Sequence, residues 1–476
     1  MECAWLKSNI KDVSFLSVFE NFLGDEIELF VKKGFESTKI NRVQQDGLFT
    51  FIAYVEGAKV GVICSDFRVF GGSFGIENSQ RAVQFLDYLE SHQIPCVFFI
   101  DAIGVRFMEG RTVLKYAFGV LPRLATFAEK ELLITVSKGN TLGIVAFYYR
   151  QGHYRLALKH KSQINLTGPE VIRLFFGQNY DFKNFSSADR QLQTRRMVQE
   201  ILPDIKNVLS RVKNLLLIRN RLPLPKEYYV PRQDEKLRSY IKPLRKPFLL
   251  EDILGNLGEA YEVYEEMDSV LRSFVVYRKG RYFGLVANNL AHSNNMVGPH
   301  GFSKFTDSFK LFEKLRLPVM TIIDTPGGDP RHAGDNVCII EEMTEAMLSI
   351  WNYPYKKLGV VAGRSFGGAS LLGMPKAAGG DRVLILEGSN IGIMHKSILR
   401  DILKKSPNIL EQWEQASLSE DEKLEDLLGN QSVDRIISRE ELPQEVDEFL
   451  LTISKTSKSE LADQNTDEIL LRKLAM

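Results

Sequence analysis

The groups in this chain that could do chemistry are mostly backbone amides, gathered in four glycine-rich turns. Each turn follows an apolar run typical of a buried strand: Gly71–Gly75, Gly104–Gly110, Gly139–Gly143 and Arg364–Ser370. Glycine permits tight turns and close backbone approach. A turn that leads from a strand into a helix leaves N–H groups without acceptors, and such groups can stabilise a developing oxyanion. A single turn of this kind is more often only a tight turn, so the hypothesis depends on turns recurring at matched places.

Matched places exist because the second half of the sequence repeats landmarks of the first half. Three pairs of landmarks share one separation of 223 residues: Gly61 and Gly284, Pro95 and Pro318, and Asp101 and Asp324. A shared separation indicates duplication of one unit of about 200 residues.

Both halves follow the same order of elements. In the first half, residue composition and spacing predict strands at 48–54, 60–65 and 95–101 and a helix at 79–92. In the second half they predict strands at 273–277, 284–288 and 318–324 and a helix at 306–315. We therefore expect an α/β protein of two tandem domains, residues 1–230 with a linker and residues 231–476.

Two charged segments are expected to lie outside these cores. Residues 181–247 contain several prolines, with helical periodicity over 192–216 interrupted at Pro203, and we interpret them as a linker with a surface helix. Residues 411–476 are charged and helical, which favours a solvated face.

Composition bounds the class of protein. The 476 residues carry a net charge of only +1, so there is no electrostatic case for nucleic acid or a membrane surface as a partner. No apolar run approaches the roughly 18 residues that span a bilayer, and the first residues do not form a secretory signal. Four cysteines without a CxxC pair fit a reducing cytoplasm.

Other catalytic patterns are weaker or missing. Gly363-Arg364-Ser365-Phe366-Gly367 has the spacing of a hydrolase nucleophile elbow, but its triad would need His395 with Asp381 or Glu387, and we favour a plain glycine turn. No GxxxxGK[ST] or HExxH pattern occurs, so neither a P-loop nor a metal site is expected. His395 is more simply a structural histidine, and the basic run 150–161 a solvated edge.

Five motifs in one order over roughly residues 45–450 resemble the β subunits of propionyl-CoA and acetyl-CoA carboxylases. Residues 66–75 resemble D-F-T-V-F-G-G-S-x-G, residues 104–110 G-A-R-I-Q-E-G, and residues 167–172 T-G-P-D-V-I. Residues 324–327 resemble D-V-P-G, and residues 364–369 resemble R-K-A-F-G-G-A.

The resemblance implies a fold and an activity. The family has two crotonase-superfamily domains and forms its active site between the first half of one subunit and the second half of its partner. A homo-oligomer built from dimers, often a hexamer, is therefore implied. The substrates are an acyl-CoA and carboxybiotin. No A-M-K-M biotinylation motif occurs, so biotin is expected on another chain, with a biotin carboxylase and a biotin carboxyl carrier as partners.

It also implies roles for particular residues, because the reaction needs two oxyanion sites rather than a side-chain base. Gly143 and Ile144 match the peptide pair that faces the thioester oxygen, and Gly368 and Ala369 match the pair that faces the biotin ureido oxygen. The acyl-CoA side is matched by Gly72, Ser73, Gly104, Val105 and Arg106, and the biotin side by Gly327, Phe366 and Gly367.

Departures from the family pattern keep two alternatives open. Ile144 stands where C-A-G-G-A has its second glycine, the K-L-T-A-R-E-R segment that contacts the CoA nucleotide is missing, and Met394-His395-Lys396-Ser397 replaces M-G-x-E-G-A. A decarboxylase of the same superfamily, or a non-catalytic carboxyltransferase-like subunit, would also fit. The acyl group is not indicated.

Overall fold

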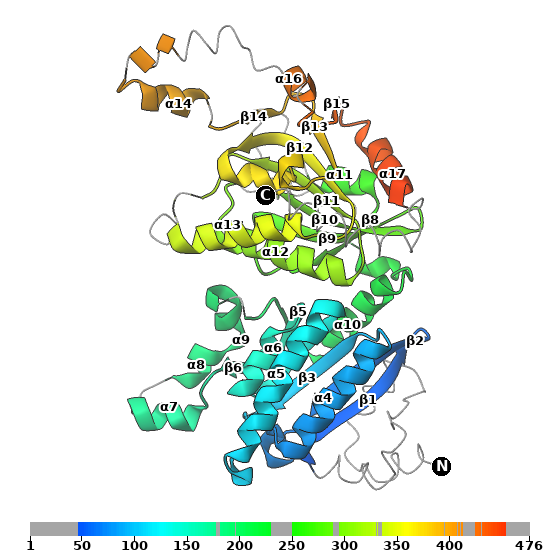
Figure 1. Ribbon diagram of the computed structural model, residues 1–476, viewed down its shortest axis with the longest axis vertical. Helices are drawn as coiled ribbons and strands as arrows, with labels where there is room; N and C mark the ends of the chain where they lie inside the picture. Colours follow the sequence, from blue (N-terminus) through cyan, green and yellow to red (C-terminus); the bar gives the residue numbers. More distant parts are fainter. Residues whose placement is uncertain are drawn as a thin grey trace, which may run out of the picture. The chain divides into compact units, whose positions relative to one another are not determined.

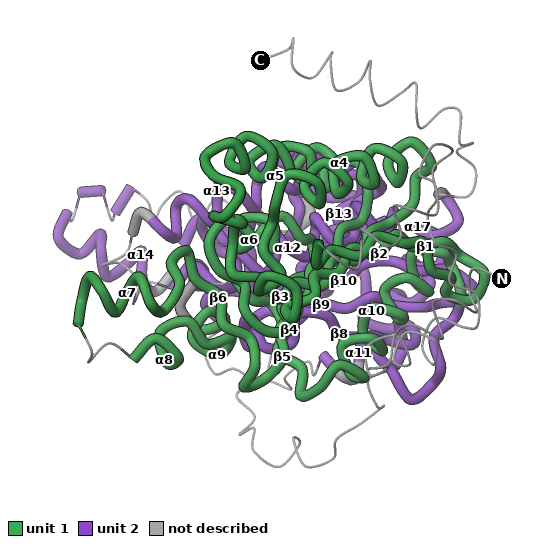
Figure 2. The backbone as a smooth tube through the Cα atoms, turned by 90° about the horizontal axis from the view of Figure 1, so that it is seen from below, with its two compact units in different colours: residues 1–222 green, residues 223–476 purple. Residues whose placement is uncertain are grey.

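Two compact units, residues 1–222 and 223–476, make up the chain (Figure 2). The computed structural model describes residues 46–177, 181–195, 197–229, 250–288, 295–329, 331, 336–394, 396–406, 408–409, 411–412, 424–429 and 431–453. His395 therefore lies outside the described residues, as do parts of the segments 181–247 and 411–476.

Unit 1 is built on a seven-stranded sheet in the order β1-β2-β3-β4-β5-β7, with β6 paired to β4 (Figure 1). β1 and β2 are antiparallel and the remaining pairs are parallel. The strands are β1 (Leu48–Val55), β2 (Ala58–Ser65), β3 (Cys96–Ala102), β4 (Leu133–Leu142), β5 (Tyr154–Leu158), β6 (Gln163–Asn165) and β7 (Glu200–Leu202). The main helices are α4 (Ile76–Ser91), α5 (Thr112–Lys130), α6 (Ile144–Arg150), α7 (Pro169–Phe176), α8 (Phe182–Ser186), α9 (Ala188–Arg190) and α10 (Ile205–Arg219).

Unit 2 repeats this plan with an eight-stranded sheet in the order β15-β13-β12-β11-β10-β9-β8, with β14 paired to β12. The strands are β8 (Glu259–Val263), β9 (Leu271–Arg278), β10 (Arg281–Asn288), β11 (Val319–Thr325), β12 (Lys357–Phe366), β13 (Arg382–Leu386), β14 (Asn390–Gly392) and β15 (Arg435–Ile437). The helices are α11 (Leu250–Leu257), α12 (Pro299–Lys314), α13 (Asn336–Trp351), α14 (Lys396–Leu403), α16 (Leu424–Gly429) and α17 (Leu442–Ile453). The predicted strands and helices of both halves are thus present at the expected places.

The repeat extends to individual contacts between helix and sheet. Gly61 donates its N–H to Pro95 O, and Gly284 donates to Pro318 O, both at 2.9 Å. Neither glycine could carry a Cβ, because it would overlap Leu89 of α4 in the first unit or the Phe312 ring of α12 in the second. The matched glycines therefore allow the same close packing of a helix on the second strand.

A bulge at the end of the third strand is also repeated. The β3–β4 register shifts between Ile100 and Ala102, and the β11–β12 register shifts between Ile323 and Thr325. At each shift an aspartate carboxylate accepts a backbone N–H of the next strand at 2.8 Å: Asp101 from Asn140, and Asp324 from Arg364. The bulge ends regular pairing and turns the chain toward the loops that follow.

The expectation of solvated faces is wrong for two helices. α10 buries Val208, Leu209, Val212 and Leu215–Ile218, and it packs against β1, β4, β5 and β7. In unit 2, α17 buries Leu442, Val446, Phe449 and Leu450 in the core formed with the sheet. The charge content of both segments therefore masked the apolar residues that these helices bury.

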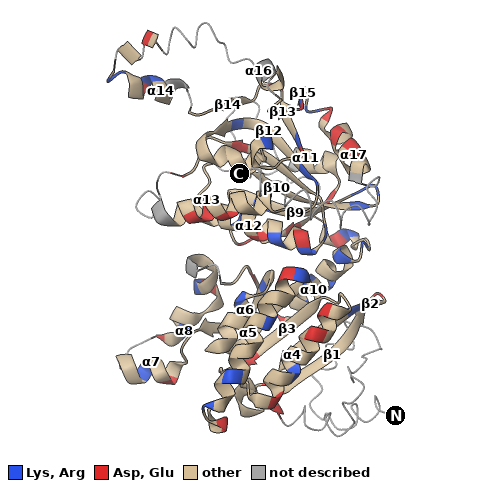
Figure 3. Cartoon of the chain, in the orientation of Figure 1, with Lys and Arg blue, Asp and Glu red and all other residues tan. Residues whose placement is uncertain are grey.

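Basic and acidic residues occur in both units, and Asp and Glu gather on α13 and α17 (Figure 3). No helix among the described residues is both long enough and apolar enough to cross a bilayer.

Lys304 is the most deeply buried charged residue described in unit 2. Lys304 of α12 is fully buried, and its Nζ donates to Asp268 O at 2.8 Å. Burial lowers the Lys304 pKa to about 8, and the charges of Asp268 and Glu262 offset this only in part. In the unfolded chain a lysine keeps its proton up to about pH 10.4. At neutral pH the protonated Lys304 therefore destabilises the folded state relative to the unfolded chain.

We therefore expect wild-type stability to rise relative to Lys304→Met as pH increases from 8 to about 10.4, by at most about 3 kcal/mol. Urea unfolding of both proteins at pH 7, 8, 9 and 10 measures the difference. A difference that stays constant over this range would mean that Lys304 keeps an ordinary pKa in the folded state.

Candidate active site

The glycine turns of unit 1 meet at the carboxyl ends of β3 and β4. Gly104 follows β3 with φ 108°, and Gly143 follows β4 with φ 65°. A Cβ added to Gly143 would lie 3.4 Å from Gly104 Cα, and one added to Gly104 would lie 3.4 Å from Leu142 O. The two turns are therefore in backbone contact, as parallel strand ends at one sheet edge should be.

Unit 2 builds the same pair. Gly327 follows β11 with φ 137°, and Gly367 follows β12 with φ 59°. A Cβ on Gly327 would lie 3.8 Å from Phe366 O, the counterpart of the Gly104–Leu142 approach. The repeat thus brings Gly327, Phe366 and Gly367, all expected from the sequence, to one place.

Backbone amides in unit 1 differ in what they are free to bind. Gly143 donates its N–H to Asn165 O at 3.1 Å, so this donor is already engaged. Ile144 begins α6, and a first helical N–H has no acceptor within its helix. Of the predicted thioester pair, the geometry leaves Ile144 as the donor.

A second donor lies in the turn after β3. Phe74 N–H donates to Gly104 O, and Arg106 N–H donates to Phe74 O, both at 2.8 Å. Because amides alternate in direction along extended backbone, the Val105 N–H points away from Phe74. In the part of the chain that the structure describes, this N–H has no acceptor. The sequence predicted Val105 as an acyl-CoA residue but not as an N–H donor. The direction of its N–H can be inferred only once the hydrogen bonds of Phe74 with Gly104 and Arg106 are known.

The matching donors in unit 2 are Gly328 and Gly368. Val297 donates to Gly327 O at 3.2 Å and accepts from Asp329 N–H at 3.0 Å, which leaves Gly328 in the place of Val105. Gly368 is the second residue of the 3-10 helix Gly367–Gly373, and both Gly367 and Gly368 are exposed. Ala369, by contrast, is fully buried.

Most of the predicted acyl-CoA residues face inward. Gly72, Ser73, Gly104 and Arg106 are buried, and Val105 is half-buried. Ser73 Oγ donates to Phe70 O at 2.7 Å, and Gly72 lies so close to Asp101 O that a Cβ would overlap it. These residues therefore shape the turn rather than present side chains to solvent.

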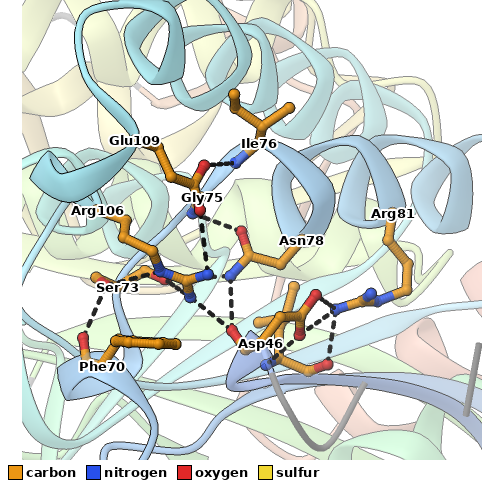
Figure 4. Close-up of polar contacts among 10 residues, drawn as sticks. Asp46, Phe70, Ser73, Gly75, Ile76, Asn78, Arg81, Arg106 and Glu109 are labelled. Carbon is orange, nitrogen blue, oxygen red and sulfur yellow. Dashed lines mark hydrogen bonds and ion pairs between the residues drawn. The ribbon is translucent and has the colours of Figure 1, made fainter. Parts of the chain in front are cut away.

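Arg106 is the centre of a buried polar network (Figure 4). Its Nη2 donates to Asp46 O at 2.7 Å and to Ser73 O at 2.9 Å, and its Nη1 lies 3.3 Å from Glu109 Oε1. Asp46 also forms an ion pair with Arg81 at 2.6 Å. Burial raises the Asp46 pKa, and the charge of Arg81 opposes the rise.

The nucleophile-elbow pattern has no elbow. Ser365 is only 2% exposed and lies within β12, paired with Thr325 and Ile391. Asp381, one candidate acid, accepts the Lys357 N–H at 2.8 Å. The described residues contain no group of three His, Cys, Asp or Glu side chains placed to hold a metal.

Comparison with known proteins identifies the family. The model of the carboxyl transferase domain matches residues 23–474. This chain belongs to the carboxyl transferase domain family. A putative propionyl-CoA carboxylase β chain of Bacillus subtilis is 21% identical over 366 residues, covering 75% of this chain and 72% of that protein.

Two further relatives agree with this assignment. The propionyl-CoA carboxylase carboxyltransferase subunit of Haloferax mediterranei is 22% identical over 361 residues, covering 74% of this chain and 69% of that one. Among solved structures, a transcarboxylase 12S with bound methylmalonyl-coenzyme A superposes with a TM-score of 0.76 at 19% identity, covering 93% and 90% of the two chains. The expected fold of two tandem crotonase-like domains is confirmed.

The family's second glycine is replaced by Ile144, whose side chain joins the core of unit 1 and is 8% exposed. The left-handed residue of the turn is Gly143, so Ile144 keeps ordinary helical backbone and its N–H survives. We expect Ile144→Gly to retain or raise kcat for carboxyl exchange while lowering stability by about 2–5 kcal/mol through loss of buried side chain.

Steady-state kinetics and urea unfolding on the same preparation separate these two effects. Ile144→Val, which keeps most of the buried volume, is the control. A folded Ile144→Gly protein with no activity would show that the side chain itself takes part in the site.

Proposed function

We propose that this chain transfers a carboxyl group from carboxybiotin, carried on a separate subunit, to the α-carbon of a short acyl-CoA thioester. The observation that supports this most directly is the duplicated pair of glycine turns. Each unit offers two backbone donors at one sheet edge, Val105 with Ile144 and Gly328 with Gly368. Two oxyanion sites are what a reaction between a thioester and a ureido group requires.

In unit 1, Val105 and Ile144 are assigned to the thioester oxygen. When the α-proton leaves, negative charge moves onto this oxygen, and two fixed N–H groups stabilise it without reorganisation. Each such donor lowers the activation barrier by about 3–4 kcal/mol. Neighbouring Ile103, Phe107 and Met108 are exposed apolar side chains that can exclude water from the reacting centre.

In unit 2, Gly367 and Gly368 suit the biotin ureido oxygen because they are exposed and carry no side chain to obstruct a ring. Gly368 N–H and Gly328 N–H can stabilise the charge that develops there. Carboxybiotin supplies CO2 and a ureido base for the α-proton, so the protein needs no side-chain base. Gly327 and Phe366 hold the backbone of this turn, and Ser370 Oγ donates to Gly367 O at 2.6 Å.

The partners follow from the same proposal. Biotin and its carboxylation would come from a biotin carboxyl carrier and a biotin carboxylase. The reaction is assigned to the cytoplasm, a reducing compartment, because Cys64 and Cys96 are free thiols and the sequence has no CxxC pair.

A homo-oligomer is also part of the proposal. α7 leaves large apolar side chains in solvent, with Leu174, Phe175 and Phe176 each more than 70% exposed. α14 in the other unit exposes Ile398 and Ile402. Exposed apolar groups of this size mark protein interfaces. The transcarboxylase 12S that shares this fold is described as a hexamer assembly.

The catalytic proposal is tested with purified chain, malonyl-CoA and free biotin, following carboxyl exchange. We expect Gly368→Pro, which removes the N–H, to lower kcat by about 10²–10³-fold. Gly368→Ala keeps the N–H but brings a Cβ within 2.5 Å of the flexible Met343 Cε, so it controls for the added volume and should retain most activity.

Equal loss in the two Gly368 variants would mean that volume, not the donor, matters. Decarboxylation without any requirement for biotin would favour the decarboxylase alternative. A wild-type chain that neither exchanges carboxyl groups nor binds CoA thioesters would contradict the proposed function.

The oligomer is tested separately by light scattering after size exclusion. The double variant Leu174→Ser with Phe175→Ser should shift the protein toward monomers at micromolar concentration. Leu451→Ser, an exposed leucine on α17, is the control and should leave the mass unchanged. An unaltered mass in the α7 variant would exclude α7 from the interface.

A further inference from the structure

The polar network around Arg106 is more extensive than a turn of this size requires. Arg106 is 8% exposed, and among the described residues its guanidinium forms hydrogen bonds with Asp46, Ser73 and Glu109. Beyond its bonds to Asp46 O, Ser73 O and Glu109, its Nε lies 3.4 Å from Ser73 Oγ, and its guanidinium carbon lies 4.7 Å from the Phe70 ring centre. To reach a CoA phosphate, Arg106 would have to give up these bonds and leave two buried carbonyls with fewer donors.

The same residue also fixes the backbone on which the thioester donor sits. Arg106 N–H donates to Phe74 O, and Phe74 N–H donates to Gly104 O. The Arg106 side chain also donates a hydrogen bond to the carbonyl of Ser73, the residue before Phe74. Backbone and side chain of one arginine thus clamp the segment 73–74 against 104–106, and Val105 lies between the two clamped residues.

Glu109 extends this clamp to the start of α4. Its Oε2 accepts the Ile76 N–H at 2.6 Å, and its Oε1 faces Arg106. Asn78 completes the connection, because its Nδ2 donates to Asp46 O and Ser73 O at 3.1 Å each. The two carbonyls that Arg106 binds are therefore also held from the helix, so the network connects Asp46, just before β1, with α4 and the turn that contains Val105 (Figure 4).

Unit 2 shows that the turn itself does not need an arginine. Asp329 takes the place of Arg106 and makes the matching backbone bond to Val297 O at 3.0 Å. Its carboxylate accepts the Arg331 N–H at 3.0 Å and pairs with the Arg331 guanidinium, which is largely exposed. In unit 1 the guanidinium instead reaches Asp46, 60 residues away in sequence. The turn of unit 2 thus forms its backbone bond without an arginine at this place.

We propose that Arg106 is a positioning residue that holds the Val105 N–H in place for the thioester oxygen, rather than a residue that binds CoA. The inference rests on the proposed function, since the thioester is the group to be polarised. Because a displaced donor weakens binding of the transition state more than binding of the ground state, loss of Arg106 should lower kcat more than it raises KM.

The first test measures the position of the segment and does not depend on activity. Backbone hydrogen exchange over residues 102–110 is compared in wild type, Arg106→Met and Arg81→Met. Arg81 is a matched control: it is half-buried in the same network and pairs with Asp46, but it bonds to Asp46 and Leu48 and not to Ser73. We expect faster exchange in Arg106→Met only; unchanged exchange would overturn the proposal.

The second test measures the consequence for catalysis. In carboxyl exchange, Arg106→Met should lower kcat by about 10–100-fold with KM for the acyl-CoA changed by less than about threefold. Arg106→Lys, which retains a donor for the Asp46 and Ser73 carbonyls, should recover part of kcat. The infrared C=O stretch of bound acetyl-CoA should shift less in Arg106→Met than in wild type.

The outcomes separate the two proposals. A raised KM with unchanged kcat would make Arg106 a binding residue, and an equal loss of kcat in Arg81→Met would reduce its role to general packing. Wild-type protein without carboxyl exchange would contradict the proposed function, and hydrogen exchange would still decide whether Arg106 holds the segment.

Discussion

A carboxylate bonded to the backbone of the neighbouring strand is the interaction on which both sites depend. Asp101 accepts the Asn140 N–H and Asp324 accepts the Arg364 N–H at the point where regular pairing ends. Gly139 and Gly363 make room for these carboxylates, since a Cβ at either position would lie within 2.8 Å of them. An ionised acceptor forms a stronger bond than a carbonyl, so the third and fourth strands stay joined although their registers shift. The glycine turns follow within a few residues, so their positions are set by the joined ends of these two strands.

The two units keep this frame and differ in the residues placed on it. Ile144 in unit 1 corresponds to Gly368 in unit 2, and the first is buried while the second is exposed. Arg106 corresponds to Asp329, so one turn carries a guanidinium bonded to the distant Asp46 carbonyl and the other a carboxylate bonded to Arg331. Duplication therefore supplied two equivalent arrangements of backbone donors, and side chains around them distinguish one from the other.

The sequence predicted the frame well because its signals are local. Apolar runs marked the strands, and the constant spacing that relates Gly61 to Gly284 revealed the repeat. Prediction was wrong for α10 and α17, where abundant charge concealed a buried apolar face. It also could not tell that the Gly143 N–H is taken by Asn165, because that bond depends on how β6 pairs with β4. The burial of Arg106 was equally out of reach, since its acceptor Asp46 lies 60 residues earlier.

The backbone conformation of Gly104 and Gly143 limits how two turns that are distant in the sequence can evolve. Each glycine has a positive φ, although a Cβ on either would find ordinary contact distances to the other turn. A substitution at either position would therefore be strained by its backbone rather than by crowding. Drift is expected at Ile144, which stands beside the pair with ordinary helical backbone, rather than at the two glycines.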